Sequence, residues 1–370
     1  MKVAILANPD STHIRKWVTA LCGVGIDIVL ISMHEFDKTQ YSCLANFKSY
    51  AMRFKVSLNY YDQKFSKLSY LTVVRKIKSI LNDEKPDILH AHYASSYGLL
   101  GALTKFHPYI ISVWGSDIFE FPYSSFIAKR ILKFNLSKAD YILATSNALA
   151  NEVKKYSPKQ CKVTPFGVDT DVFVKNKKRN YFEGQSIVIG AIKTFEKVYG
   201  IEYLIRAFAI VADNLPEANL NLLLVGKGSC ETEYHLMVKE LGLEQKVIFA
   251  GYVDHTEISD CYNNLDIFVV PSIRESFGVS ALEASACGLP VIASDTGGLP
   301  EVVINNVTGI IVPVQDSQAI AQAIKKLVED KALREKLGNN GRKMVVENYK
   351  WSDCLAGMMN VYAGILNTEK

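Results

Sequence analysis

Short apolar runs rich in Val, Ile and Leu alternate with amphipathic stretches along the whole chain. A buried parallel strand has the first pattern, and the helix that connects it to the next parallel strand has the second. We therefore expect an α/β protein with doubly wound parallel sheets. The apolar runs predict strands at residues 2–7, 27–32, 87–92, 109–114, 141–146, 161–166, 187–192, 220–226, 246–252, 266–272, 290–295 and 308–314.

The pattern divides into two tandem domains. A chain of 370 residues is too long for one ordinary core and suits two domains of roughly 150–200 residues each. We expect a Rossmann-like domain at residues 1–170, a second at 171–350, a polar linker at 167–185, and a last helix within 351–370 that packs back on the first domain. The other expected helices are 13–22, 70–82, 126–138, 200–213, 231–241, 277–287, 317–328 and 331–346.

Several classes of protein do not fit this sequence. No run approaches the ~18 consecutive apolar residues that a membrane-spanning helix needs. Residues 1–10 have only a short apolar stretch before polar residues, so we interpret them as a first strand rather than a secretory signal. The seven cysteines are scattered, with no Cys-x-x-Cys pair. This argues against structural zinc and a disulfide framework and favours a reducing cytoplasm.

The two halves of the chain differ in charge. Residues 1–170 carry 22 Lys and Arg against 13 Asp and Glu, a net charge of +9, and residues 171–370 carry −5, which together give the formal +4. A basic half favours an anionic partner such as nucleic acid or a membrane surface. Scattered solvated lysines are the alternative.

The most informative stretch is 271–303, where an expected strand ends and a helix begins near Gly278. A helix amino terminus offers unpaired amides and a positive dipole end to a phosphate group, and a glycine allows close approach. Glu275 precedes this helix and is placed for sugar hydroxyls, whereas Glu283 suits a ribose diol. The alternative is a capping residue and a solvated glutamate. The strand, Gly278 and the Gly-Gly that follows at 297–298 favour the ligand site.

The stretch from Glu275 to Glu283 resembles the Glu-x7-Glu signature of retaining glycosyltransferase family 4, the glycosyl transferases group 1. The resemblance extends along nearly the whole chain and implies the GT-B fold, in which two Rossmann-like domains face each other across a deep cleft. The other segments that resemble the family are DILHAH (87–92), VWGSD (113–117), FGVD (166–169) followed by Phe173, LLLVGKG (222–228), FAGYV (249–253), Asp266 with PS (271–272), and GGLPEVV (297–303).

The resemblance implies transfer of a sugar from a nucleotide diphosphate sugar with retention of anomeric configuration. It places the donor mainly on the second domain and the acceptor mainly on the first. Carried over to this chain, it assigns the donor ribose to Glu283 and the transferred sugar to Glu275, with backbone amides holding the diphosphate. The donor-binding residues are then Glu283, Ser276, Phe277, Gly278, Val279, Gly251 and Tyr252. Of these, Gly251 and Tyr252 are expected near the base.

The family also places an Arg and a Lys at the donor phosphates, just after the first strand of the second domain. Here Ala191 stands at the Arg position, and Lys193 and Lys197 are the available cations. A fixed cation stabilises the charge that develops on a leaving diphosphate. A solvated loop lysine is the alternative for either. No cluster of residues in the chain has metal-ligand spacing, so we expect no metal and no cofactor beyond the donor.

The first domain supplies the acceptor candidates. His92 ends an expected strand and faces the cleft more plausibly than His90, although a structural role is the alternative. Asp117 is either a ligand carboxylate or a helix cap. No catalytic base stands out, which suits a retaining reaction in which the donor phosphate accepts the proton. The catalytic candidates are Glu275, Lys193, Lys197, His92 and Asp117. The acceptor-binding candidates are His13, Arg15 and Trp114. For His13 and Arg15 the alternative is that they are ordinary surface residues of a helix.

Other functions are compatible with two such domains. A nucleotide-sugar epimerase would use the donor site alone. A non-catalytic nucleotide-sugar-binding subunit is a further alternative, against which the presence of both Glu275 and Glu283 argues. A dehydrogenase would have Gly-x-Gly-x-x-Gly after the first strand, where this chain has residues 8–13 without it, and nothing marks a phosphorylase lysine. We favour a hexosyltransferase that uses a UDP-sugar, or a GDP-sugar, and acts on a glycan or lipid-linked acceptor in cell-surface polysaccharide or glycoconjugate biosynthesis.

The charge split favours a membrane partner over nucleic acid. Cations alternate with aromatic residues in segment 47–67, as suits a bilayer interface with anionic headgroups. We therefore expect a cytoplasmic enzyme that docks peripherally on the inner membrane face; a fully soluble enzyme is the alternative. The residues concerned are Lys48, Arg53, Lys55, Lys64 and Lys67 with Phe47, Tyr50, Phe54, Tyr60, Tyr61 and Phe65.

Overall fold

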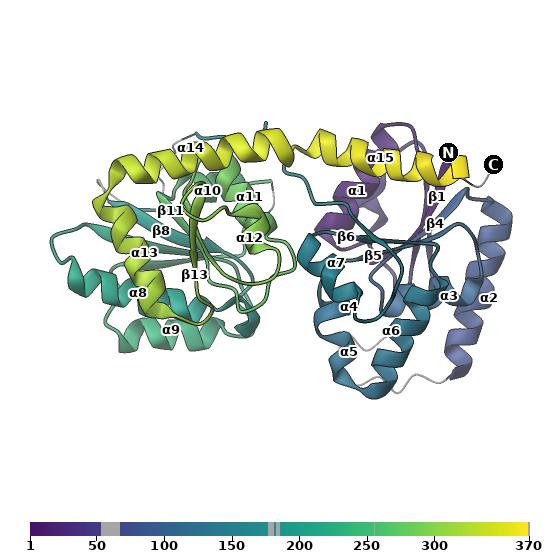
Figure 1. Ribbon diagram of the computed structural model, residues 1–370, viewed down its shortest axis with the longest axis horizontal. Helices are drawn as coiled ribbons and strands as arrows, with labels where there is room; N and C mark the ends of the chain where they lie inside the picture. Colours follow the sequence, from purple (N-terminus) through teal and green to yellow (C-terminus); the bar gives the residue numbers. More distant parts are fainter. Residues whose placement is uncertain (53–66, 177–180, 183–185, 255, 369–370) are drawn as a thin grey trace. The chain divides into compact units, whose positions relative to one another are not determined.

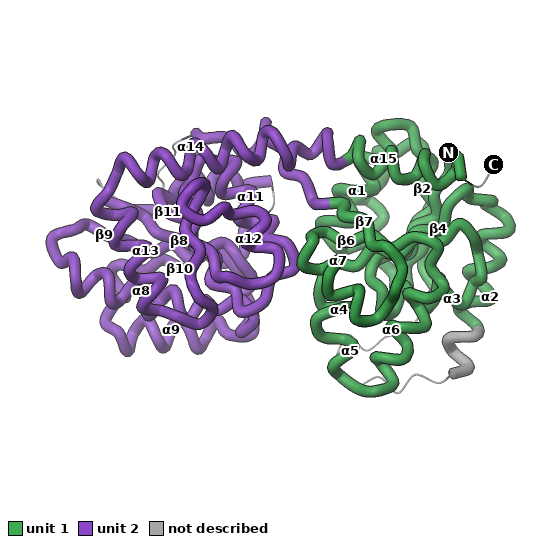
Figure 2. Tube along the Cα trace, viewed as in Figure 1, with its two compact units in different colours: residues 1–164, 355–370 green, residues 165–354 purple. Residues whose placement is uncertain are grey.

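The structure is a computed structural model that describes residues 1–52, 67–176, 181–182, 186–254 and 256–368 (Figure 1). The chain divides into two compact units, which Figure 2 shows in different colours. Unit 1 is Met1–Thr164 together with Leu355–Lys370, and unit 2 is Pro165–Cys354. These limits differ by a few residues from the expected 1–170 and 171–350.

Unit 1 is built on a seven-stranded parallel sheet. The sequence predicts six of its strands and not β3, because Phe47–Ala51 mixes polar and apolar residues and is only half-buried. In their order across the sheet the strands are β3 (Phe47–Ala51), β2 (Asp27–Ser32), β1 (Lys2–Leu6), β4 (Ile88–His92), β5 (Tyr109–Val113), β6 (Tyr141–Ala144) and β7 (Cys161–Val163).

The helices of unit 1 cover this sheet (Figure 1). Their buried faces follow helical spacing, as in α6, where Ala128, Leu132 and Leu136 are buried and Ser125 caps the first turn by accepting a hydrogen bond from the amide of Ala128. The helices are α1 (Thr12–Gly23), α2 (Lys67–Glu84), α3 (Ser96–Thr104), α4 (Ser116–Phe119), α5 (Phe121–Ser124), α6 (Phe126–Lys138) and α7 (Asn147–Val153), with a single turn η1 (Lys38–Tyr41).

Unit 2 has a six-stranded parallel sheet, and all six strands are predicted by the sequence. The order across the sheet is β10 (Val247–Gly251), β9 (Leu220–Val225), β8 (Ile187–Ile192), β11 (Ile267–Val270), β12 (Val291–Ser294) and β13 (Gly309–Val312). Around it lie η2 (Lys197–Tyr199), α8 (Ile201–Asn214), α9 (Glu231–Glu240), α10 (Ile258–Asn263), α11 (Val279–Ala286), α12 (Leu299–Val302), α13 (Ser317–Glu329) and α14 (Lys331–Asn348).

In each sheet the strand order reverses at one point, between β1 and β4 in unit 1 and between β8 and β11 in unit 2. At such a switch point the loops after the two neighbouring strands leave toward opposite faces and open a crevice at the carboxyl ends of the strands, where open α/β sheets bind ligands. The sheet topology therefore directs attention to the loops after these four strands.

The last helix, α15 (Trp351–Thr368), runs from the end of unit 2 into unit 1. Within unit 1 the hydroxyl of Tyr362 lies 2.8 Å from Nδ1 of His90, a buried residue of β4. The carboxyl-terminal helix thus supplies a side chain to the interior of the amino-terminal sheet.

Residues 167–176 are not the linker that their polar composition predicts. Phe173 is fully buried in unit 2, and the guanidinium of Arg342 donates hydrogen bonds to the carbonyl oxygens of Phe173 and Thr170. Val168 pairs with Lys350 in an isolated bridge. The segment packs through the ring of Phe173, which lies 5.9 Å from that of Tyr262, as well as through its carbonyl groups. Residues 177–180 and 183–185 of the expected linker lie outside the described residues.

Among the described residues, no helix combines the length and the apolar character that crossing a bilayer requires.

Candidate functional site

The switch point of unit 2 brings together two residues from the expected donor site. Lys193 directly follows β8, and Glu275 lies in the loop after β11, the strand that pairs with β8. Nζ of Lys193 lies 2.7 Å from Oε2 of Glu275, and the hydroxyl of Ser272 donates to the same oxygen at 3.3 Å. The parallel register of the two strands therefore builds an ion pair at the carboxyl edge of the sheet.

This ion pair is largely withdrawn from solvent, with 19% of the Lys193 side chain and 9% of the Glu275 side chain exposed. Nζ of Lys193 also lies 4.5 Å from the ring centroid of Tyr199. Burial by itself lowers the pKa of Lys193, but the charge of Glu275, helped by Tyr199 and Glu283, outweighs it and holds the pKa above its ordinary value. Lys193 therefore stays a fixed cation at neutral pH.

Helix α11 begins immediately after this pair, at Val279, two residues later than expected. Its N-cap is Gly278, with φ of 104°, and no side chain caps the first turn. A Cβ at Gly278 would lie 2.8 Å from Leu299 and 3.1 Å from Val302, so both the backbone conformation and the space require glycine. The amides of the first turn are consequently free of a side-chain cap, as an anion site requires.

The side chain of Phe277 has a structural role. It is buried, and its ring packs against Phe166 and Tyr349 at centroid distances of 6.3 and 5.9 Å. Only the backbone of Phe277 is therefore available to a ligand, as the sequence analysis assumed, and its anchored ring holds the loop between Ser276 and Gly278 in place.

Gly297 and Gly298 hold the same loop from the other side. Gly297 has φ of 53°, and a Cβ there would lie 1.7 Å from the carbonyl oxygen of Glu275, which accepts a hydrogen bond from the amide of Gly298 at 3.1 Å. The Gly-Gly pair thus allows a backbone contact that positions Glu275. The sequence analysis noted these glycines without assigning this role.

Glu283 lies in the second turn of α11, where the hydroxyl of Tyr262 donates a hydrogen bond to its Oε2 at 2.8 Å. Tyr262 belongs to α10 and is fully buried. Burial, together with the negative charge of Glu283, raises the pKa of Tyr262 well above its ordinary value. The phenol therefore remains a hydrogen-bond donor and orients the carboxylate.

Lys197 does not join the ion pair. It lies in η2, its side chain is 76% exposed, and its Nζ lies 3.8 Å from Glu233 on α9. The structure therefore brings Lys193, and not Lys197, to Glu275. A Cβ at Gly251, the last residue of β10, would lie 3.3 Å from the side chain of Lys227, and Tyr252 is exposed.

The switch point of unit 1 carries a cluster of aromatic rings. His92 ends β4, and its ring lies 5.0 Å from that of Trp114, which follows β5. Trp114 also meets His13 of α1 edge to face at 5.9 Å. Three of the expected acceptor-side residues therefore converge, although they come from three different elements.

His92 is nearly inaccessible and stacks on His90 with ring centroids 4.1 Å apart. Burial lowers the pKa of His92 to about 3, so its imidazole is neutral at physiological pH. Nδ1 of His92 is buried, and no hydrogen-bond partner exists for it among the described residues. His90 differs, because its two ring nitrogens contact Tyr362 and Ser112.

Asp117 has a structural role that differs from the predicted helix cap, because it lies inside α4, whose N-cap is Gly115 without a side-chain cap. Its carboxylate is fully buried and accepts hydrogen bonds from the amides of Ala94, Trp114 and Gly115 at 2.7, 3.1 and 2.8 Å. Burial raises the pKa of Asp117, and these amides oppose that rise. Asp117 therefore ties the loops after β4 and β5 together instead of presenting a carboxylate to a ligand.

Arg15 points to another part of unit 1. Its guanidinium contacts Gln40 at 3.2 Å and Thr12 at 3.5 Å. Tyr93, which sequence reasoning did not single out, lies beside Trp114 at 5.9 Å instead, and its φ of 81° is strained for a bulky residue. Such strain often marks functional loops, but it leaves no signal in a single sequence.

Three further residues of unit 2 contribute to the candidate donor site, and the sequence analysis assigned no role to them. Their positions follow from strand and helix packing. They are Tyr199, Tyr262 and Ser272.

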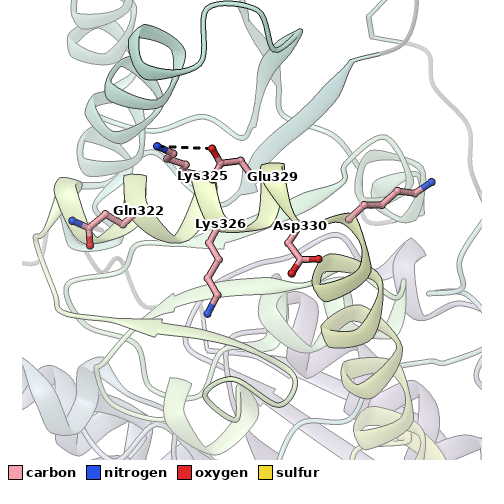
Figure 3. A pocket seen from close by; sticks show the side chains of 6 residues that line it. Gln322, Lys325, Lys326, Glu329 and Asp330 are labelled. Carbon is pink, nitrogen blue, oxygen red and sulfur yellow. Dashed lines mark ion pairs between the residues drawn. The ribbon is translucent and has the colours of Figure 1, made fainter.

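The described residues contain no group of three or more His, Cys, Asp or Glu side chains placed to hold a metal ion. Figure 3 shows a shallow hollow on α13 and the start of α14, and none of the predicted site residues lines it. Its lining residues are Gln322, Lys325, Lys326, Glu329, Asp330 and Lys331.

Part of the expected membrane segment is integral to unit 1. Lys48 of β3 pairs with Glu84 at 2.9 Å, and the hydroxyl of Tyr50 donates to the same carboxylate at 2.6 Å. The ring of Phe47 stacks on Tyr41 at 4.8 Å. These contacts stabilise the edge strand β3. Lys67, at the other end of the segment, is the first residue of α2. The other residues named for this segment, Arg53, Phe54, Lys55, Tyr60, Tyr61, Lys64 and Phe65, lie outside the described residues.

Comparison with known families accounts for both units. Residues 173–344 match the family model described as glycosyl transferases group 1, and residues 2–146 match the model described as glycosyl transferase 4-like. Together the two matches span most of the chain.

Individual proteins extend this similarity. The capsular polysaccharide biosynthesis glycosyltransferase CapM of Staphylococcus aureus is 30% identical over 320 residues, which cover 80% of this chain and 82% of CapM. The N-acetyl-alpha-D-glucosaminyl L-malate synthase of Bacillus anthracis is 28% identical over 320 residues, 81% of this chain and 80% of that protein. The crystal structure of Anabaena Alr3699/HepE in complex with UDP has the same fold, with a TM-score of 0.80 and 18% identity over 98% of this chain and 100% of that one.

Proposed function

The chain belongs to the glycosyl transferases group 1 and has their GT-B fold, and from this premise we propose that it moves a sugar from a nucleotide diphosphate sugar to an acceptor hydroxyl with retention of anomeric configuration. The observation that carries the proposal is the contact between Lys193 and Glu275 beside the uncapped amino terminus of α11. A cation, a carboxylate and a helix amino terminus without a side-chain cap meet there at one edge of the sheet.

In this proposal each group has a separate task. The amides from Ser276 to Val279 hold the diphosphate, and Lys193 stabilises the negative charge that develops on it as the sugar leaves. Both described hydrogen bonds to the Glu275 side chain go to Oε2, so Oε1 is the oxygen that we assign to a sugar hydroxyl. Glu283, oriented by Tyr262, receives the ribose hydroxyls.

Retention requires the acceptor to approach from the face that the diphosphate leaves. We infer that a phosphate oxygen of the donor accepts the proton of the acceptor hydroxyl, since Asp117 is buried and His92 is held neutral with a low pKa. Unit 1 is assigned to the acceptor, with His92, Trp114 and His13 as its contact residues.

The donor is assigned as a UDP-sugar, with a GDP-sugar as the second choice. Support comes from HepE, which shares the fold and was crystallised with UDP. In our assignment the base lies near Gly251 and Tyr252, where Tyr252 is exposed and can stack on a base. No divalent ion is assigned to the diphosphate, because Lys193 and the helix amino terminus supply the positive charge.

The acceptor is assigned as a glycan or a lipid-linked sugar at the cytoplasmic face of a membrane. Support comes from the similarity to CapM, whose name places it in capsular polysaccharide biosynthesis, and from the basic character of residues 1–170. A cell-surface polysaccharide or glycoconjugate is the product that this assignment predicts.

Two measurements test the proposal. A panel of nucleotide sugars, screened by the rise in melting temperature, identifies the donor, because a ligand that binds only the folded state raises its stability. Nucleotide release is then measured with and without acceptor. Acceptor-dependent release and a product with the donor's anomeric configuration are expected. Interconversion of nucleotide sugars without an acceptor would instead show an epimerase, and binding without any turnover would show a non-catalytic subunit.

A further inference from the structure

Helix α6 and the short helix α5 before it present an exposed apolar surface on unit 1. Tyr123, Phe126 and Ile127 are 66%, 69% and 68% exposed, and Phe134 is 39% exposed. We call these four residues the α5–α6 patch. Single exposed apolar residues are ordinary on folded proteins, but large apolar side chains gathered on one element mark an interaction site.

The exposure of the patch follows from how α6 packs. Ala128, Leu132 and Leu136 face the core of unit 1 and hold the helix in place. Phe126 and Phe134 lie two turns apart on the opposite side of the helix. Because the helix is anchored by its buried face and capped by Ser125, the apolar residues are presented to solvent by an ordered element.

Basic side chains surround the patch. Helix α6 carries no Asp or Glu, and the guanidinium of Arg130 lies 4.5 Å over the ring of Phe126, while Nζ of Lys138 lies 5.6 Å from the ring of Phe134. Each cation is thus held directly beside an exposed ring. The basic residues of the helix are Lys129, Arg130, Lys133 and Lys138.

An acidic side chain also touches the patch. The hydroxyl of Tyr123 donates to Oε1 of Glu152 at 3.2 Å, and Oε2 of Glu152 is paired with Lys155 at 2.7 Å. The charge of Glu152 is therefore compensated locally, and the basic residues of α6 keep a net attraction for anions.

We propose that the α5–α6 patch docks unit 1 on a bilayer surface that contains anionic lipid. Rings and aliphatic groups enter the boundary between headgroups and acyl chains, and the cations meet lipid phosphates. The buried core of a protein–protein interface is depleted in lysine, so the interleaved cations favour a lipid surface over a protein partner. Docking on a bilayer would bring unit 1 to the lipid-linked acceptor of the proposed function, and the inference rests on that function. Vesicle binding can nevertheless be measured without catalysis.

The test is sedimentation of the full chain with vesicles of phosphatidylcholine alone or mixed with phosphatidylglycerol. We expect binding to the anionic vesicles only, weakening as salt rises. In the variant Lys129→Gln/Arg130→Gln/Lys133→Gln, loss of three cations should weaken binding ~100-fold, at about fivefold each. In Phe126→Ser/Ile127→Ser, loss of two inserted side chains should weaken it at least ~10-fold.

Matched controls come from unit 2. Lys325→Gln/Lys326→Gln/Lys331→Gln removes the same charge from α13 and α14, where Glu329 lies 3.8 Å from Lys325 (Figure 3). Leu236→Ser/Val346→Ser removes two exposed apolar side chains. Both controls should bind vesicles as the unchanged chain does.

Three results would overturn the proposal. They are no binding of the unchanged chain to anionic vesicles at low salt, equal binding by the patch variants and the controls, and a dimer in solution that the patch variants convert to a monomer without vesicle binding. Turnover of a water-soluble acceptor, measured on the same variants, reports the proposed function separately. Full turnover without vesicle binding would reject only the docking surface, and vesicle binding without turnover would reject only the function.

Discussion

Nζ of Lys193 and Oε2 of Glu275 lie 2.7 Å apart although 82 residues separate them in the chain. The contact exists because β8 and β11 are neighbours in the sheet and both end at the same edge. Since the pair is largely buried, removing one partner leaves the other as an unpaired charge, which costs far more than an exposed pair contributes. Experiments on this site must therefore measure stability together with activity.

The paired glutamates should be essential for transfer. Glu283→Ala removes hydrogen bonds to a charged group worth ~1.5–3 kcal/mol, so kcat/KM should fall roughly ten- to hundredfold. Glu275→Gln should give a similar loss, and it keeps more of the packing beside Lys193 than Glu275→Ala does. Glu329→Ala, on the exposed face of α13, is the control and should behave as the unchanged chain. Near-normal turnover in the Glu275 variant, with an intact melting transition, would refute the assignment.

Substitution of Lys193 should lower kcat much more than substitution of Lys197. Lys193→Met should lower kcat by ~10²–10³, the loss typical when a preorganised group that stabilises developing charge is removed. Lys197→Met should change kcat little, because its side chain is exposed and contacts Glu233. Steady-state kinetics with the identified donor give both values. A larger loss in Lys197→Met than in Lys193→Met would mean that the exposed lysine moves to the diphosphate when the donor binds.

Tyr262 should act on the donor through Glu283. Tyr262→Phe removes the hydroxyl that orients the carboxylate, and the KM for the donor should rise by up to ~10-fold, as for loss of one hydrogen bond to a charged group. Tyr234→Phe is the matched control, because Tyr234 is equally buried and its hydroxyl donates to Glu202 at 3.3 Å, in contact with neither glutamate of the site. Both variants should lose some stability, so an equal KM in the two would reject the positioning role.

His92 should make the protein less stable in acid. Its pKa is lowered to about 3 in the folded chain, while the unfolded chain takes up this proton near pH 6.5. Between these two values the unfolded state binds more protons, so the free energy of unfolding should fall with falling pH by up to about 1.4 kcal/mol per unit for this group. His92→Phe should flatten that dependence in melting curves recorded from pH 7 to 5.

The same variant reports on the acceptor. Since Nδ1 of His92 has no partner among the described residues, phenylalanine should be tolerated in the aromatic cluster at neutral pH. If His92 contacts the acceptor, the KM for the acceptor should rise while the melting shift produced by the donor is unchanged. An unchanged KM with a flattened acid dependence would assign His92 to the structure of unit 1 alone.

Transfer should not depend on a divalent ion. Lys193 and the amides at the start of α11 are placed to carry the diphosphate charge, so the rate after dialysis against EDTA should equal the rate before it. Loss of turnover that magnesium or manganese restores would show that the diphosphate needs a metal that these groups do not replace.

The parallel sheets, the loop before α11 and the spacing of Glu275 and Glu283 were predictable, because each depends on a local pattern of the chain. Apolar runs of strand length alternate with helical periodicity, and the nine-residue stretch from Glu275 to Glu283 spans a loop and one helix turn whose geometry hardly varies. Strand β3 was not predictable in this way, since an edge strand that is half-buried needs no apolar run.

Side-chain contacts between residues that are distant in the chain depend on tertiary packing and were not predictable from the sequence. The sequence alone does not distinguish Lys193 from Lys197. In the structure Lys193 follows β8 and pairs with Glu275, whereas Lys197 lies in η2 and contacts Glu233. The role of Asp117 follows from the loops after β4 and β5, which place three backbone amides around its carboxylate. Lys48, which belongs to the segment expected to contact a membrane, pairs with Glu84 of α2. In each case the deciding neighbour lies on another element, and its position follows from strand register and helix packing, which a local pattern does not contain.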